Sequence, residues 1–358
     1  MSLIAARRYS SCMHGGRVGH LVDRHPTVSP ERLIAQLRPP PTFADVSFAS
    51  YRPDPGEPSQ AAAVAACQDF CREAVERRAG RRKLLGKRAV LPGVGLYLDG
   101  GFGVGKTHLL ASAYYQLPGE GPQPPTPKAF ATFGELTQLA GVFGYVECID
   151  MLAGYTAVCI DEFELDDPGN TTLISRLLSS LVERGVSVAA TSNTLPEQLG
   201  EGRFAAQDFL REINTLASIF TTVRIEGPDY RHRGLPPAPQ PLSDEEVVAR
   251  AATVEGATLD DFDALCAHLA TMHPSRYLTL IEGVTAVFLT GVHGIDDQNV
   301  ALRLVSLTDR LYDAGIPVVA SGARLDTVFS EEMLAGGYRK KYLRATSRLV
   351  ALTQGREP

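Results

Sequence analysis

The stretch that decides the fold is Val94-Gly95-Leu96-Tyr97-Leu98-Asp99-Gly100-Gly101-Phe102-Gly103-Val104-Gly105-Lys106-Thr107-His108-Leu109-Leu110-Ala111. It joins an apolar strand, a glycine-rich turn that ends in Gly-Lys-Thr, and the start of a helix. Glycines in such a turn let backbone N–H groups curl around phosphate oxygens, and a helix N-terminus favours negative charge. The pattern predicts a phosphate-binding loop (P-loop), with an ordinary glycine-rich strand–helix turn as the alternative.

The positions of this loop have separate expected roles. Lys106 would neutralise phosphate oxygens, and the Thr107 hydroxyl would be a ligand of Mg²⁺. The residues that we expect to contact the nucleotide are Gly100, Gly101, Phe102, Gly103, Val104, Gly105, Lys106, Thr107 and His108.

A second acidic element ends the apolar strand expected over residues 157–160. We expect this strand to lie next to the P-loop strand, so that Asp161 holds Mg²⁺ through water. Glu162 would polarise the attacking water as a general base. The alternative is a strand that ends in solvated acids.

Polar and basic residues that follow a third strand, residues 186–191, could complete the site. The Asn193 amide would bond the lytic water or the γ-phosphate and so sense hydrolysis, with a plain turn residue as the alternative. An arginine from a neighbouring subunit would stabilise the transition state in an oligomer. The candidates are Arg203 and Arg211, with Arg231 and Arg233 as further choices, and each is otherwise a surface salt-bridge residue.

These strands alternate with helices, which predicts an α/β fold: a parallel sheet covered by helices on both faces. Residues 286–289 and 316–321 echo the core strands without a second P-loop, which predicts further strand–helix–strand structure. The domains expected are an extended, partly disordered N-terminal arm (1–58), a P-loop core (59–233), a proline-rich linker (234–241) and a smaller C-terminal α/β unit (242–358).

Composition limits the class of protein. Of the 358 residues, 44% are hydrophobic and 21% charged, which is ordinary for a globular protein with a sizeable core. The net charge of −6 argues against wholesale non-specific binding of nucleic acid. The six cysteines form no Cys-x-x-Cys pair, so we expect free thiols in a reducing compartment. The first 22 residues lack acids, which favours a disordered leader, with a targeting segment as the alternative.

Two basic clusters have no assigned role. Residues 72–88 hold eight Lys and Arg against two Glu, and residues 338–344 read Tyr-Arg-Lys-Lys-Tyr-Leu-Arg. Each could contact a polyanion, an acidic protein or anionic lipid, or be a solvated helix face.

Several motifs resemble the ZapE cell-division ATPases of bacteria and their mitochondrial AFG-type, or lactation-elevated, relatives. The matching stretches are 95–98 with the P-loop, 159–163, 190–194, 229–231, 303–312 and 345–349. The last two carry most weight, because generic P-loop ATPases lack them. Two family segments are altered: a His-Phe-His segment is here Lys128-Ala129-Phe130-Ala131, and Arg-x-Arg-Phe-Leu maps onto residues 206–210 without those arginines.

The resemblance implies an AAA+-like core, ATP as substrate, a homo-oligomer with shared sites, and Gln60 near the nucleotide base. It also implies a protein partner: the division ring in bacteria, or inner-membrane proteins in mitochondria. Three functions follow as hypotheses. The first is a cytoplasmic ATPase, alternatively of the mitochondrial matrix, that remodels a protein partner. The second is a nucleic-acid-loading ATPase that uses residues 72–88. The third is a non-hydrolysing ATP-binding scaffold. Peripheral membrane contact stays open.

Overall fold

A computed structural model describes residues 18–27, 29–79, 81–84, 87–119, 127–165, 168–199, 209–228 and 238–354. Arg203, Arg231 and Arg233 lie outside these residues, as do the first 17 positions.

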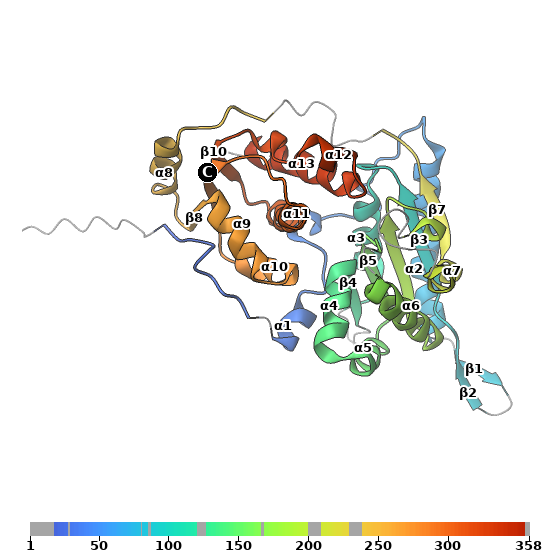
Figure 1. The fold of residues 1–358 in the computed structure, drawn as a ribbon. Helices are drawn as coiled ribbons and strands as arrows, with labels where there is room; N and C mark the ends of the chain where they lie inside the picture. Colours follow the sequence, from blue (N-terminus) through green and yellow to red (C-terminus); the bar gives the residue numbers. More distant parts are fainter. Residues whose placement is uncertain are drawn as a thin grey trace, which may run out of the picture.

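The larger unit is built on a five-stranded sheet (Figure 1). All its neighbouring strands run parallel, in the order β4-β5-β6-β3-β7. The strands are β3 (Gly95–Gly100), β4 (Lys128–Thr132), β5 (Ala157–Asp161), β6 (Ser187–Ser192) and β7 (Thr221–Ile225). This confirms the predicted α/β fold. The expectation that the strand of Asp161 adjoins the P-loop strand is wrong, because β6 lies between β3 and β5.

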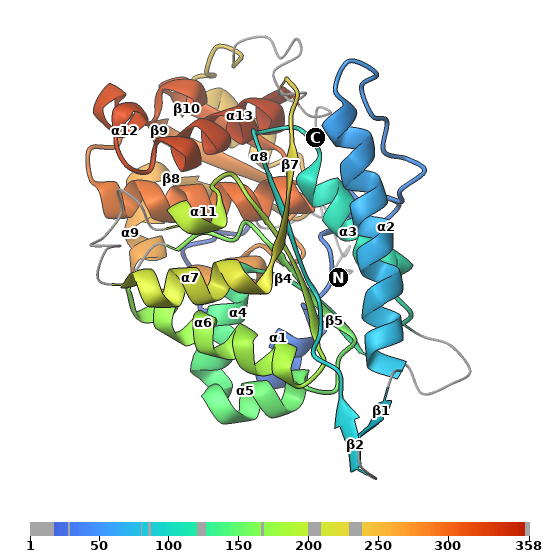
Figure 2. The ribbon, with the colours of Figure 1, turned by 90° about the vertical axis from the view of Figure 1, so that its right-hand side faces the viewer.

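Helices cover both faces of this sheet (Figure 2). They are α2 (Pro58–Ala79), α3 (Lys106–Gln116), α4 (Phe133–Phe143), α5 (Tyr145–Leu152), α6 (Pro168–Glu183) and α7 (Leu210–Ile219). Side chains alternate along a strand, so Leu96 and Leu98 pack with α2 and α3 while Tyr97 packs with α4 to α7. Each buried leucine contributes about 1.5–3 kcal/mol relative to an exposed one.

The C-terminal unit has its own three-stranded parallel sheet, in the order β10-β9-β8. Its strands are β8 (Ala257–Asp261), β9 (Ala286–Val292) and β10 (Val318–Gly322). Its helices are α8 (Asp244–Ala251), α9 (Phe262–Ala270), α10 (Tyr277–Leu280), α11 (Gln298–Ala314), α12 (Glu331–Ala335) and α13 (Arg339–Gln354). The expected strand–helix–strand structure is present as β9-α11-β10.

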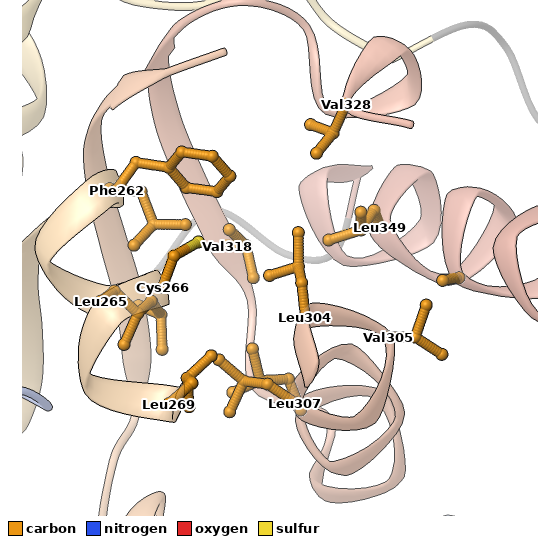
Figure 3. Close-up of a cluster of buried hydrophobic side chains, with 14 of the residues drawn as sticks. Phe262, Leu265, Cys266, Leu269, Leu304, Val305, Leu307, Val318, Val328 and Leu349 are labelled. Carbon is orange, nitrogen blue, oxygen red and sulfur yellow. The ribbon is translucent and has the colours of Figure 1, made fainter. Parts of the chain in front are cut away.

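One apolar cluster holds this unit together (Figure 3). Leu265 and Leu269 of α9 face Leu304 and Leu307 of α11, and Leu349 of α13 lies beside them. The helices α11 and α13 are thereby fixed to each other and to the small sheet. On the other face of that sheet, α8 packs against a second, smaller cluster.

The N-terminal arm contacts both units. Gly19 forms a parallel β-bridge with Thr258 of β8, and Leu21 is buried in the apolar cluster of the C-terminal unit. Farther along, α1 (Pro30–Ala35) contributes the buried Leu33 to the core of the larger unit, and Phe48 packs on the other face of its sheet. The described part of the arm therefore runs along both units.

The basic stretch 72–88 splits between two elements. Residues 72–79 lie on α2, which ends at Ala79, and an antiparallel hairpin follows, β1 (Arg81–Leu84) with β2 (Lys87–Val90). This hairpin projects away from the five-stranded sheet (Figure 1). On α2, Arg78 donates hydrogen bonds to the carbonyl oxygens of Ala153 and Gly154.

Candidate functional site

The P-loop connects β3 to α3 with the side chain of Lys106 folded over it. The Lys106 Nζ donates to the carbonyl oxygens of Gly100 (2.8 Å) and Gly101 (2.6 Å) and to Oδ1 of Asn193 (2.7 Å). An ammonium group has three N–H donors, and these acceptors match them in number. The structure thus brings together two predicted site residues, Lys106 and Asn193, from neighbouring strands.

The start of α3 is prepared for an anion. Gly105 occupies the N-cap position, has φ of +87°, and provides no side-chain acceptor to the first turn. The first turn also lacks acidic residues. The N–H groups of the first turn and the positive end of the helix dipole therefore point toward the loop.

The arm closes over this loop at Tyr51. Its hydroxyl donates to the carbonyl oxygen of Val104 at 2.8 Å, and its ring lies edge-on to His108, with centroids 5.6 Å apart. A Cβ on Gly105 would lie 2.5 Å from the Tyr51 ring. The sequence carried no signal for Tyr51, because it lies 53 residues before its partner Val104.

Asp161 and Thr107 meet at the carboxyl edge of the sheet. The Thr107 hydroxyl lies 3.1 Å from both carboxylate oxygens of Asp161, and the Thr191 hydroxyl also donates to Asp161. Asp161 itself is buried. Hydroxyl and carboxylate oxygens are the ligands that Mg²⁺ prefers, and Mg²⁺ commonly binds one or two carboxylates plus substrate phosphates. Thr107 and Asp161 therefore fit the metal predicted for them.

In the described ranges, no group of three or more His, Cys, Asp or Glu residues could hold a metal ion. The described cysteines are all buried free thiols.

Glu162 is held by the C-terminal unit. Its Oε1 lies 3.2 Å from Nη1 of Arg344 and 3.4 Å from Nη2 of Arg348, both on α13. Asp309 on α11 binds the same two arginines, at 2.7 Å from Arg344. Glu162 is also the one described non-glycine residue with positive φ, at +54°.

The pKa values of the two carboxyl groups in this cluster, Glu162 and Asp309, depend on their burial and on the charges beside them. Burial raises the pKa of Glu162, against the effect of Arg344 and Arg348, and the neighbouring Asp309 carboxylate adds to the rise. Burial alone would raise the pKa of Asp309 as well, but the two guanidinium groups bring it below its ordinary value. Asp309 is therefore the firm counterion of the arginines, and Glu162 is the weaker one.

The basic cluster 338–344 belongs to this contact. Lys340 Nζ donates to the carbonyl oxygen of Asn193 at 2.6 Å, and Lys341 lies 4.0 Å from the buried Glu164. Neither the polyanion interpretation nor the solvated-face interpretation describes these two lysines, because they contact the chain's own core. Arg339, by contrast, is exposed.

Two other predicted site residues lie elsewhere. Arg211 lines an open cavity of about 320 Å³ with Arg176 and Ser175, between α6 and α7, and no P-loop residue lines that cavity. Its role as a trans-acting arginine stays a prediction. Gln60 is buried, accepts from the Asp54 N–H (2.8 Å) and donates to the carbonyl oxygen of Glu226 (3.0 Å). It ties the arm to the end of β7, and its contact with a nucleotide base stays a prediction.

Sequence reasoning missed Thr191, Arg344, Arg348 and Asp309 as site residues. Asp309 and Arg348 fall in the stretches 303–312 and 345–349, which had been noted only for their family resemblance, and Arg344 is the last residue of the basic cluster 338–344. A signal was therefore present, but its place beside Glu162 appears only in the fold.

The parallel sheet and the glycine-rich loop between β3 and α3 define an α/β protein of the P-loop class. The family model described as AFG1-like ATPase matches residues 27–245 and 235–357. The chain belongs to this family.

Individual proteins are similar to parts of this chain. The chain is 30% identical over 277 residues to the cell division protein ZapE of Escherichia coli K12. This alignment covers 67% of this chain and 74% of that protein. It is 26% identical over 218 residues to lactation elevated protein 1 homolog B of Danio rerio, and this alignment covers 50% of this chain and 42% of that protein. Among solved structures, domain III of the DnaA replication initiation protein of Thermotoga maritima gives a TM-score of 0.38 at 18% identity, over 53% of this chain and 69% of that one.

Membership of this family implies ATP binding and hydrolysis. As for membranes, none of the helices in the described residues combines the length and the apolar character that a bilayer crossing needs.

Proposed function

We propose that the protein hydrolyses ATP with Mg²⁺ and couples hydrolysis to the remodelling or regulation of a protein partner. The observation that carries this proposal is the meeting of the Thr107 hydroxyl with both carboxylate oxygens of Asp161, at 3.1 Å, beside an uncapped helix N-terminus. The two side chains offer oxygen ligands for a metal beside the loop that would hold phosphates, and this supports the proposal.

Different residues of the chain would have separate roles in ATP binding and hydrolysis. Backbone N–H groups of the loop would bind phosphate oxygens, and Lys106 would turn from Asn193 to the phosphates. Bound Mg²⁺, held by Thr107 and through water by Asp161, would spread the charge of the γ-phosphoryl group. Glu162 would accept the proton of the attacking water, and Asn193 would orient that water.

The partner and the assembly are part of the proposal. Because a relative is named as a cell division protein, a division-related partner is the first to test. We further propose a homo-oligomer in which Arg211 or Arg203 reaches the site of the neighbouring subunit. Arg211 lines a cavity whose lining includes no P-loop residue, which is compatible with action in trans.

Phosphate release from ATP tests the proposal directly. The full chain should release phosphate with Mg²⁺ and stop when EDTA removes the metal, and Lys106→Ala should be inactive. Activity per subunit should rise steeply with protein concentration if the sites are shared. Tight ATP binding without turnover at any concentration would instead favour the non-hydrolysing scaffold.

A second candidate function, loading on nucleic acid, is favoured by the hairpin β1-β2. Five of its eight residues are Lys or Arg. Basic residues gathered on one element can neutralise the phosphates of a nucleic acid. If single-stranded DNA at moderate salt changes neither the ATPase rate nor the oligomeric state, this candidate should be dropped.

A further inference from the structure

One face of α13 connects the C-terminal unit to the edge of the large sheet where the site lies. Its cationic residues 340, 344 and 348 are four positions apart and so share a face. Lys340 contacts Asn193 after β6, while Arg344 and Arg348 contact Glu162 after β5. A single helix therefore contacts the two residues expected to act on the attacking water.

The two arginines keep a counterion when Glu162 leaves them. Each binds Asp309 as well as Glu162, and Asp309 lies on α11 of the same unit. A buried charge left without a partner is strongly destabilising. Because Asp309 stays with the arginines, separation of α13 from β5 leaves neither guanidinium without a carboxylate.

The contact with Glu162 is also incomplete. Both guanidinium groups approach one oxygen, Oε1, at 3.2 Å and 3.4 Å. Within the described residues, the Nε atoms of Arg344 and Arg348 are buried without a hydrogen-bond partner. Glu162 meanwhile adopts φ of +54°, a conformation that is unfavourable for a residue with a side chain. The ion pairs of Glu162 with Arg344 and Arg348 are therefore ones that the carboxylate and the two guanidinium groups could exchange for other partners.

We infer that Asp309, Arg344 and Arg348 form a latch, through which the position of the C-terminal unit controls ATP hydrolysis. With the latch closed, Glu162 binds the arginines and does not bind the attacking water. When α13 moves relative to β5, Glu162 is released and hydrolysis proceeds. The arginines are positioning residues, because they act through Glu162. This inference rests on the proposed role of Glu162 as general base.

Steady-state kinetics of latch variants test the inference. The variants are Arg344→Ala and Arg348→Ala, each also combined with Glu162→Gln, and the control is Arg339→Ala, which alters an exposed arginine of the same helix. With the latch weakened, kcat should rise about 3- to 10-fold at unchanged KM for ATP, a lowering of the barrier by about 0.7–1.4 kcal/mol. In the Glu162→Gln background the same changes should have no effect, because there is no base to release.

Other outcomes have definite meanings. A fall of kcat in both arginine variants, with folding intact by thermal unfolding, would overturn the latch, since the arginines would then be needed during hydrolysis. An unchanged kcat would overturn it too. If Arg348→Ala does not fold, Arg348→Lys replaces it, because a lysine keeps the charge but cannot bridge two carboxylates as a fork. Failure of the wild-type chain to bind ATP would contradict the proposed function itself, before any variant is compared.

Discussion

The Thr191 hydroxyl donates a hydrogen bond to the Asp161 carboxylate and accepts one from the backbone N–H of Glu162, at 3.1 Å. Thr191 is buried on β6, the strand between the P-loop strand and the strand of Asp161. One side chain therefore orients both acidic residues of the site. Strand β6, which separates β5 from the P-loop strand, thus also supplies the hydroxyl group that holds the Asp161 carboxylate in place.

Thr191→Val should weaken both stability and catalysis. Valine has the same shape but leaves the partly buried Glu162 N–H without its acceptor, which costs about 1–3 kcal/mol. The free energy of unfolding from urea titration should fall by that amount, and kcat should fall as well. Thr191→Ser, which keeps the hydroxyl, should preserve most of both. Equal losses in Ser and Val variants would mean that the methyl group matters and the hydroxyl does not.

Glu162→Gln should bind ATP but turn over slowly. Glutamine keeps the size of the side chain and cannot accept the proton, and general-base catalysis typically contributes 10²–10⁴-fold to a rate. We expect kcat to fall by at least about 10²-fold with KM changed little. Single-turnover phosphate release checks the chemical step. Normal turnover in this variant would remove Glu162 as the base.

The sequence predicted the parts of the site that depend on local pattern. The P-loop, the end of β5 at Asp161 and the end of β6 before Asn193 follow from apolar runs that stop at polar residues, and the structure has them. Such local patterns do not predict the order of the strands. Strand β6 lies between β3 and β5 because it pairs with both of them. The hairpin after Ala79 was missed since its residues are mainly basic, without the β-branched alternation of a typical strand.

Contacts that span the chain could not be predicted at all. Arg348 and Glu162 are 186 residues apart, and Tyr51 and Val104 are 53 apart. Nothing in local periodicity connects such pairs; they meet because α13 and the arm are packed on separate apolar clusters. The stretch 345–349 was recognisable as a family feature, but the role of Arg348 appears only when both units are in view.

Gly105→Ala should disable the P-loop. Residue 105 has φ of +87°, and a Cβ there would lie 2.5 Å from the Tyr51 ring, so the loop or the arm must shift. We expect a loss of stability of about 1–3 kcal/mol and a large rise in KM for ATP. Gly134→Ala is the matched control, because a Cβ at this helical position meets nothing within 4 Å. The control should be neutral or stabilising by up to about 1 kcal/mol. Intact ATP binding in Gly105→Ala would show that the glycine is not required there.

Asp313 should make stability depend on pH in the neutral range. Burial raises the pKa of this α11 carboxyl to about 7, with the Asp309 and Glu162 carboxylates adding to the rise and Arg348 and Arg310 opposing it. In the unfolded chain its pKa is about 3.9. The folded state therefore binds the extra proton between these values, and the stabilisation is fully present below about pH 4 and is lost as pH rises through about 7.

Asp313→Asn removes this dependence, because the amide resembles the protonated acid at every pH. Urea unfolding at pH 5 and pH 8 should show the wild-type chain losing more stability than the variant on going to pH 8, by no more than about 1.4 kcal/mol per pH unit between 5 and 7. The variant should also be at least as stable as the wild type at pH 8. If both proteins lose the same stability between the two pH values, Asp313 is already ionised in the folded state at pH 5, and the positive charges of Arg310 and Arg348 outweigh its burial.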